Sequence, residues 1–202
     1  MKTKLLITLL TCVAASASFA DELKVGAEAP AFTLKDSSGK THSLSDYKGK
    51  FVVLEWFNEG CPFVKKHYTS GNMQKLQGEY TGKDVVWLSI NSSAPGEQGH
   101  MTADSTPKTV DEWKIKATQI LFDNDGKVGK MYGAKTTPHM FVIDKEGKLV
   151  YQGAIDSKAT ANAADVNDAE NYVKVALDST MAGKPVSNAS TKPYGCSVKY
   201  AK

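Results

Sequence analysis

Residues 51–62, FVVLEWFNEGCP, decide the fold of this chain. Residues 51–57 are a nearly continuous apolar run of β-prone side chains, the pattern of a strand that is buried on both faces. Residues 58–60 read as a short loop. Pro62 then opens a helix, because the first helical position does not need the N–H that proline lacks. Cys61 is therefore predicted at the N-terminus of a helix, directly after a buried strand.

Outside this stretch, strand patterns alternate with helix patterns. Strands are predicted at 31–34, 41–44, 51–57, 84–90, 120–122, 139–143 and 149–155, and helices at 62–80, 109–118, 126–132 and 169–181. Gly71 and Asn72 weaken the first helix and predict a kink or break there. Residues 92–107 read as a long loop of a kind that often carries function, while the tail, 186–202, shows no strong pattern. This order predicts one α/β domain whose sheet is covered on both faces and preceded by a hairpin.

The first twenty residues have the pattern of a secretory signal peptide. Two lysines precede an apolar run at 5–15, and small residues allow cleavage after Ala20. The run is too short to span a bilayer, and Cys12 lacks the small preceding residue that lipoprotein processing expects. We expect a periplasmic or secreted protein. Its mature domain is residues 21–202, with no membrane insertion after cleavage.

Composition excludes several classes of protein. The chain is 41% hydrophobic and 23% charged, which is ordinary globular usage. All 25 basic residues are lysines, so no arginine is available for a bidentate clamp on an anion or for reading guanine edges. We expect no nucleic-acid partner. Cleavage leaves two cysteines, Cys61 and Cys196, and an oxidising compartment would allow them to keep a disulfide.

The predicted position of Cys61 favours a reactive cysteine. Free backbone N–H groups and the positive end of the helix dipole favour a thiolate over a thiol. Lys65, one turn on, would add positive potential. The expected result is a nucleophilic sulfur. The alternative is a buried structural cysteine that does not react.

Further motifs extend the pattern over residues 25–200. They are residues 26–34, then Leu44, Asp46, Tyr47, Gly49 and Lys50, then residues 61–65, 132–134, 137–139 and 195–199. Together they resemble the peroxiredoxin-like, or redoxin, group of the thioredoxin-fold superfamily, of the alkyl hydroperoxide reductase/thiol-specific antioxidant type. The resemblance implies a thioredoxin-like fold, in which a central mixed sheet is flanked by helices. It also implies a cis peptide bond at Thr137-Pro138, beside the reactive cysteine. We expect no cofactor.

The chain departs from these relatives at positions that matter for the reaction. Thioredoxins carry a second cysteine where this chain has Val64, so thioredoxin-type cycling within one helical turn is excluded. Asn58 and Leu54 replace the threonine and proline that precede the peroxiredoxin cysteine, and Pro138 stands where the family's arginine aligns. These departures favour disulfide exchange, whereas the overall likeness favours peroxide reduction. A thiolate could also react slowly with peroxide.

Cys196 is the natural partner of Cys61 in a two-cysteine cycle. After Cys61 attacks a disulfide or a peroxide, Cys196 would resolve the mixed disulfide or sulfenic acid and form a Cys61–Cys196 bond. The tail around Gly195 is expected to be flexible enough for this approach. A permanent structural disulfide between the same two residues is the alternative.

The remaining candidates allow functional and structural interpretations. His139 could face Cys61 as a base, could face solvent, or could join the two cysteines in a soft copper site. No other metal-ligating set is expected. His67 is expected to be exposed. The residues expected to shape the site are Asn58, Pro62, Lys65, Thr137, Pro138 and His139.

The sequence therefore predicts an exported thiol oxidoreductase, with Cys61 as nucleophile and Cys196 as resolving cysteine. Its partners would be a peroxide or disulfide substrate and an unidentified thiol reductant. A copper chaperone without turnover and a redox-inactive scaffold are the alternatives from other classes.

Overall fold

The computed structural model describes residues 23–202. The predicted signal peptide, residues 1–20, lies outside these described residues. Within them, no helix combines the length and the apolar character needed to cross a bilayer.

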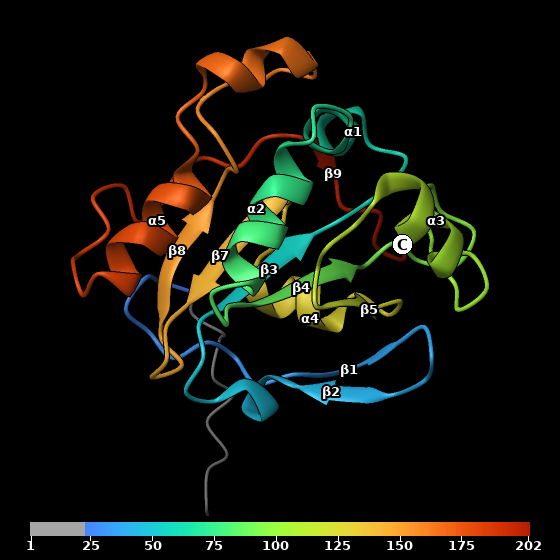
Figure 1. The fold of residues 1–202 in the computed structure, drawn as a ribbon. Helices are drawn as coiled ribbons and strands as arrows, with labels where there is room; N and C mark the ends of the chain where they lie inside the picture. The colour runs from blue at the N-terminus through green and yellow to red at the C-terminus, as the bar shows by residue number, and fades with distance from the viewer. Residues whose placement is uncertain (1–22) are drawn as a thin grey trace, which may run out of the picture.

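Seven strands form one mixed sheet in the order β2-β1-β5-β4-β3-β7-β8 (Figure 1). The central pairs β3–β4 and β4–β5 are parallel, whereas β3–β7, β7–β8 and the hairpin β1–β2 are antiparallel. The strands are β1 (Thr33–Asp36), β2 (Thr41–Ser43), β3 (Val52–Trp56), β4 (Val86–Asn91), β5 (Gln119–Phe122), β7 (His139–Ile143) and β8 (Leu149–Gly153). The hairpin joins the sheet at β5, so the predicted N-terminal extension is confirmed.

Helices cover both faces of the sheet. They are α1 (Pro62–Thr69), α2 (Asn72–Thr81), α3 (Thr106–Trp113), α4 (Lys127–Tyr132) and α5 (Tyr172–Met181), with short 3-10 helices η1 (Leu44–Tyr47) and η2 (Ala163–Asp168). Figure 1 shows α1, α2, α3 and α5 in front of the sheet and α4 behind it. Each face has its own apolar core, and the predicted α/β fold is confirmed.

Strand β3 sets the position of Cys61. Its side chains alternate, with Val53 in the core under α1 and α2, and Leu54 and Trp56 in the core on the other face. All five β3 residues are buried, as a strand covered on both sides requires. The break predicted within the helix that follows β3 is also present. Gly71, with φ +75°, separates α1 from α2.

The C-terminal residues form structure that the sequence did not predict. Residues 189–200, here called the C-terminal strap, hold strand β9 (Cys196–Ser197), which pairs antiparallel with β6 (Thr136–Thr137). On the edge strand β8, Gln152 N–H donates to Ala189 O and Gln152 O accepts from Thr191 N–H, both at 3.0 Å. The Tyr200 hydroxyl donates to Ala134 O at 2.8 Å. Backbone hydrogen bonds therefore hold the strap against β8 and β6, whereas the sequence predicted only a flexible tail around Gly195.

Candidate active site

Cys61 occupies the N-cap position of α1, with Pro62 as the first helical residue. Its backbone N–H donates to Asn58 O at 3.1 Å, and its carbonyl accepts from Lys65 N–H at 2.9 Å. The side chain is 0% exposed, and Sγ donates to Thr137 O at 3.0 Å. The predicted location at a strand-to-helix junction is thus present, and the sulfur points to the loop that carries Thr137.

The Thr137-Pro138 peptide bond is cis, as the resemblance implied. Thr137 ends β6 and Pro138 leads into β7. Since β7 pairs with β3, the chain returns here to the end of the strand that precedes Cys61. The topology therefore brings together residues that are far apart in the sequence.

Cys196 lies directly across the small sheet from Thr137, in the paired register Thr137↔Cys196. Burial raises the pKa of the Cys196 thiol to about 11, and a hydrogen bond with Cys61 and the charge of that neighbour add to the shift. Lys199 acts in the opposite direction. Both cysteines are free thiols in this structure. At neutral pH Cys196 is therefore protonated and adjacent to Cys61.

Gly195 makes this approach possible. Its φ is +140°, and a Cβ at this position would lie 2.1 Å from Thr137 O. No other residue fits such a contact without moving the backbone. The glycine therefore lets the strap lie directly against the carbonyl that contacts Cys61.

Asn58 connects the site to the long loop after β4. Its Oδ1 accepts from Gly60 N–H at 2.7 Å, and its Nδ2 donates to Ser93 Oγ at 3.2 Å and to Gln98 O at 3.0 Å. Gly99, with φ +72°, leaves room for this side chain. Asn58 therefore fixes the loop around residues 93–99 against the turn before Cys61.

His139 does not lie in the core that contains Cys61. His139 is buried on the opposite side of β7 from Met140, its ring lies 4.5 Å from that of Phe141, and Nδ1 accepts from Lys135 N–H at 3.3 Å. Burial lowers the pKa of His139 to about 3. Met140, not His139, shares the core of Cys61, so both the Cys61-facing and the solvent-facing interpretations of His139 are wrong. Lys65 is exposed on α1.

The ligand set of the copper alternative is therefore not assembled. It requires His139 beside both cysteines, and the strand alternation directs this ring to the other face of the sheet. Among residues 23–202, no group of three His, Cys, Asp or Glu side chains could hold a metal ion.

The structure contains a buried polar cluster on α1 that the sequence did not predict. Lys66 and His67, the fifth and sixth residues after Cys61, meet Asp156 and Tyr194 in the interior. His67 is 0% exposed, so the expectation that it is exposed is wrong. Burial, opposed by the charge of Asp156, lowers the pKa of His67 to about 4. Helical periodicity alone could not find this cluster, because two of its members lie far away in the sequence.

Glu55 is a second buried group that was missed. It lies in the middle of β3 and accepts hydrogen bonds from Trp87 Nε1 at 2.9 Å, Ser89 Oγ at 2.9 Å, Tyr68 Oη at 3.0 Å and Gln77 Nε2 at 3.2 Å. Burial raises the pKa of its carboxyl above the ordinary value. An acidic residue inside an otherwise apolar strand was the available signal in the sequence.

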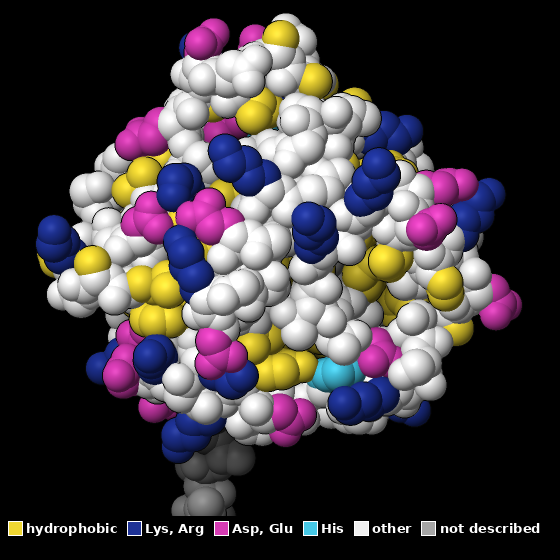
Figure 2. Space-filling model, viewed as in Figure 1, with side chains coloured by type: hydrophobic (Ala, Val, Ile, Leu, Met, Phe, Trp, Pro, Cys, Tyr) yellow, Lys and Arg dark blue, Asp and Glu magenta, His cyan; other side chains and the backbone are white. Residues whose placement is uncertain are grey.

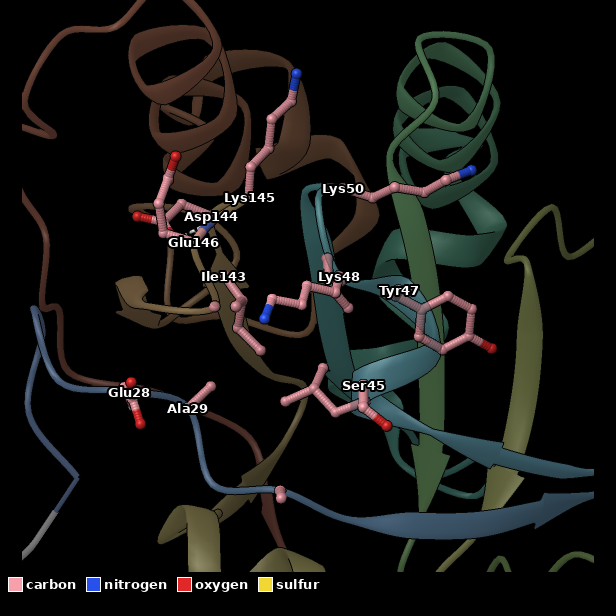
Figure 3. Close-up of a pocket in the computed structure, with 14 residues that line it drawn as sticks. Glu28, Ala29, Ser45, Tyr47, Lys48, Lys50, Ile143, Asp144, Lys145 and Glu146 are labelled. Atoms are coloured by element: carbon pink, nitrogen blue, oxygen red, sulfur yellow. Dashed lines mark hydrogen bonds between the residues drawn. The ribbon is translucent and has the colours of Figure 1, made fainter.

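The surface pocket formed by the described residues does not belong to the Cys61 site. Figure 2 shows lysine and acidic side chains interspersed over the face it presents. A pocket of about 200 Å³ lies between η1 and the β7–β8 turn, where Ala29, Ser45 and Ile143 surround it (Figure 3). Its lining contains neither cysteine, so it is separate from the Cys61 site.

Comparison with known proteins agrees with this geometry. The model of the AhpC/TSA family matches residues 25–152, which include Cys61 and Pro138 but not Cys196. The thiol-disulfide oxidoreductase ResA of Geobacillus thermodenitrificans is 30% identical over 154 residues, which cover 74% of this chain and 83% of that protein.

Solved structures show the same fold. An uncharacterised conserved protein from Geobacillus kaustophilus is 27% identical and has a TM-score of 0.74, covering 89% of this chain and 93% of that one. The thioredoxin domain of a Bacteroides vulgatus thiol-disulfide oxidoreductase has a TM-score of 0.53 at 23% identity, covering 72% and 97%. The chain therefore belongs to the AhpC/TSA family and is a thiol oxidoreductase of the thioredoxin fold.

Proposed function

We propose that this chain exchanges its Cys61–Cys196 dithiol with a disulfide substrate. One observation carries the proposal. The register Thr137↔Cys196 places the second cysteine beside the carbonyl that accepts from Cys61 Sγ at 3.0 Å. Two thiols far apart in the sequence thus share one small site, as a cycle between dithiol and disulfide requires.

The reaction consists of two displacements. The Cys61 thiolate attacks one sulfur of the substrate disulfide. The substrate S–S bond breaks, a mixed disulfide forms, and the leaving thiolate takes up a proton. Cys196 then loses its proton and attacks Cys61 Sγ, which forms the Cys61–Cys196 bond and releases the second substrate thiol. The substrate gains two electrons and two protons. A separate thiol reductant returns the pair to the dithiol.

The raised pKa of Cys196 assigns the two roles. A thiol with a pKa of about 11 is almost entirely protonated at neutral pH and is a poor first nucleophile. Cys61 is the N-cap residue of α1 and therefore lies at the positive end of the helix dipole. We therefore assign the first attack to Cys61 and the resolving step to Cys196.

Disulfide exchange is favoured over peroxide reduction. The chain has no arginine to stabilise the charge that shifts when an O–O bond breaks. Asn58, at the position of the family's threonine, is engaged with Ser93 and Gln98. The similarity of this chain to the thiol-disulfide oxidoreductase ResA supports the same choice. The signal-peptide pattern supports an exported protein, in a compartment where disulfides persist.

Variants of the two cysteines test this proposal. With a disulfide peptide as substrate, Cys61→Ser should abolish exchange, and Cys196→Ser should accumulate a mixed disulfide on Cys61 that mass spectrometry detects. Parallel rates with hydrogen peroxide separate the two reactions, and faster consumption of peroxide than of disulfide would refute the choice of substrate. A pair that stays fully oxidised across glutathione buffers would instead indicate a permanent structural disulfide.

A further inference from the structure

The C-terminal strap closes the site as well as supplying Cys196. Cys61 is 0% exposed, and both Tyr194 and Cys196 pack against the apolar core that contains it. Strand β9 pairs with Thr136–Thr137, the backbone edge nearest to Sγ. A large substrate therefore cannot reach Cys61 while β9 is in place.

Tyr194 attaches the strap to the helix that begins at Cys61. Its hydroxyl donates to Asp156 Oδ1 at 2.5 Å and lies 3.1 Å from His67 Nε2. His67 Nδ1 lies 3.0 Å from Asn72 Nδ2, an amide donor, so the ring accepts there and donates to the tyrosine through Nε2. The Tyr194 ring meets Phe63 edge to face at 5.9 Å. The phenol hydroxyl therefore both donates and accepts a hydrogen bond within this cluster.

The acceptor of this hydrogen bond is half of a buried ion pair. Lys66 Nζ lies 3.2 Å from Asp156 Oδ2 and donates to Lys158 O at 2.6 Å. It also lies 3.3 Å from the Tyr194 hydroxyl and 5.3 Å from the centre of that ring. Charges removed from water need hydrogen-bond partners, and the phenol hydroxyl supplies one by donating to Asp156 Oδ1. Release of Tyr194 has a cost because it leaves the pair without this partner.

Tyr194 is also close to Cys196 in the sequence. Only Gly195, seated on Thr137 O, separates it from Cys196. A rigid contact at Tyr194 and a tight contact at Gly195 leave Cys196 little freedom. We propose that Tyr194 is the latch of the strap, which holds Cys196 against Cys61 and shields Cys61 from large disulfides. The positioning part of this proposal rests on the proposed function.

The latch predicts two regimes of reactivity. Small reagents enter through local fluctuations, whereas a bulky reagent or a polypeptide disulfide reacts only after β9 leaves β6. The rate with a bulky reagent is then the intrinsic rate multiplied by the fraction of open strap. A change that weakens the latch raises this rate more than the rate with a small reagent.

Alkylation of Cys61 in the Cys196→Ser background tests the latch. The probes are iodoacetamide and a maleimide carrying a polyethylene glycol chain, and each rate is divided by the rate with the urea-unfolded protein. Tyr194→Phe keeps the ring and removes the hydroxyl. We expect its rate with the bulky probe to rise by about tenfold or more, since a hydrogen bond to an ionised group is worth at least about that factor. The matched control is Tyr47→Phe, which removes a hydroxyl 2.8 Å from His42 Nδ1, far from the strap.

The positioning role has a separate measurement. With both cysteines present, the closed fraction of the reduced strap sets the effective concentration of Cys196. Tyr194→Phe should therefore shift the equilibrium of the Cys61–Cys196 disulfide with glutathione toward the dithiol by the factor by which it lowers that fraction, whereas Tyr47→Phe should leave it unchanged. Equal rates of Tyr194→Phe and the parent with the bulky probe would overturn the latch. Alkylation needs no turnover, so a variant series that shows the latch in a chain without exchange activity would overturn only the proposed function.

Discussion

Oxidation of Cys61 and Cys196 should stabilise the folded protein strongly, because the bond joins residues that are far apart in the sequence. It would close a loop of about 135 residues in the unfolded chain, for which the loop-entropy relation gives about 5 kcal/mol. The two thiols are already in contact in the reduced structure, so closing the bond requires little rearrangement. We expect a gain of about 3 to 5 kcal/mol in the free energy of unfolding.

Urea unfolding of the reduced and oxidised protein measures this gain. At a slope of about 2 kcal/mol per molar urea, the midpoint should rise by about 2 M. Fluorescence is a suitable signal, because Trp56 and Trp87 are fully buried. Cys196→Ser treated with the same oxidant is the control and should not shift. Identical midpoints for monomeric reduced and oxidised protein, or an equal shift in the control, would refute the pairing.

Three further perturbations follow from the buried polar groups and one glycine. Unfolded His67 takes up a proton near pH 6.5 but the folded one only near pH 4, so stability is lost as the pH falls through this window. Between pH 8 and pH 5, urea unfolding of the wild type should lose about 2 kcal/mol more than that of His67→Gln, and parallel losses would contradict the assignment. Asp156→Asn leaves a buried ammonium without its counter-ion and should cost about 3 to 5 kcal/mol in the same assay. Asp84→Asn, in an exposed pair, should change stability little, and similar losses for both would sink this account. Gly99→Ala would place a Cβ 1.9 Å from Asn58 Oδ1 and should cost about 1 to 3 kcal/mol. A double-mutant cycle with Asn58→Ala should show a smaller cost, and strict additivity would exclude the clash.

The fold was predictable because its signals are local. The apolar run before Cys61 specified a strand buried on both faces, and Pro62 specified where the next helix starts. Gly71 marked the break in that helix. Each of these features depends on neighbouring residues, so periodicity and turn chemistry were sufficient.

The missed features depend on contacts between distant segments. Two-residue strands such as β9 have no periodicity, and their pairing is decided by the partner edge. Lys66 and His67 look like a solvated helix face until Asp156 and Tyr194 cover them. The position of His139 was missed for a simpler reason. Strand alternation places His139 and Met140 on opposite faces of the sheet. The sequence does not say which of these faces holds Cys61.

The attachment of the strap to β8 has a consequence for solubility. Because β8 is the last strand of the sheet, its free backbone edge could pair with another molecule. Ala189 and Thr191 occupy part of this edge through Gln152, upstream of the latch. Opening at β9 alone therefore leaves the edge protected. Truncation before Ala189 would instead give a chain that associates edge to edge with its own copies, rather than a permanently open enzyme.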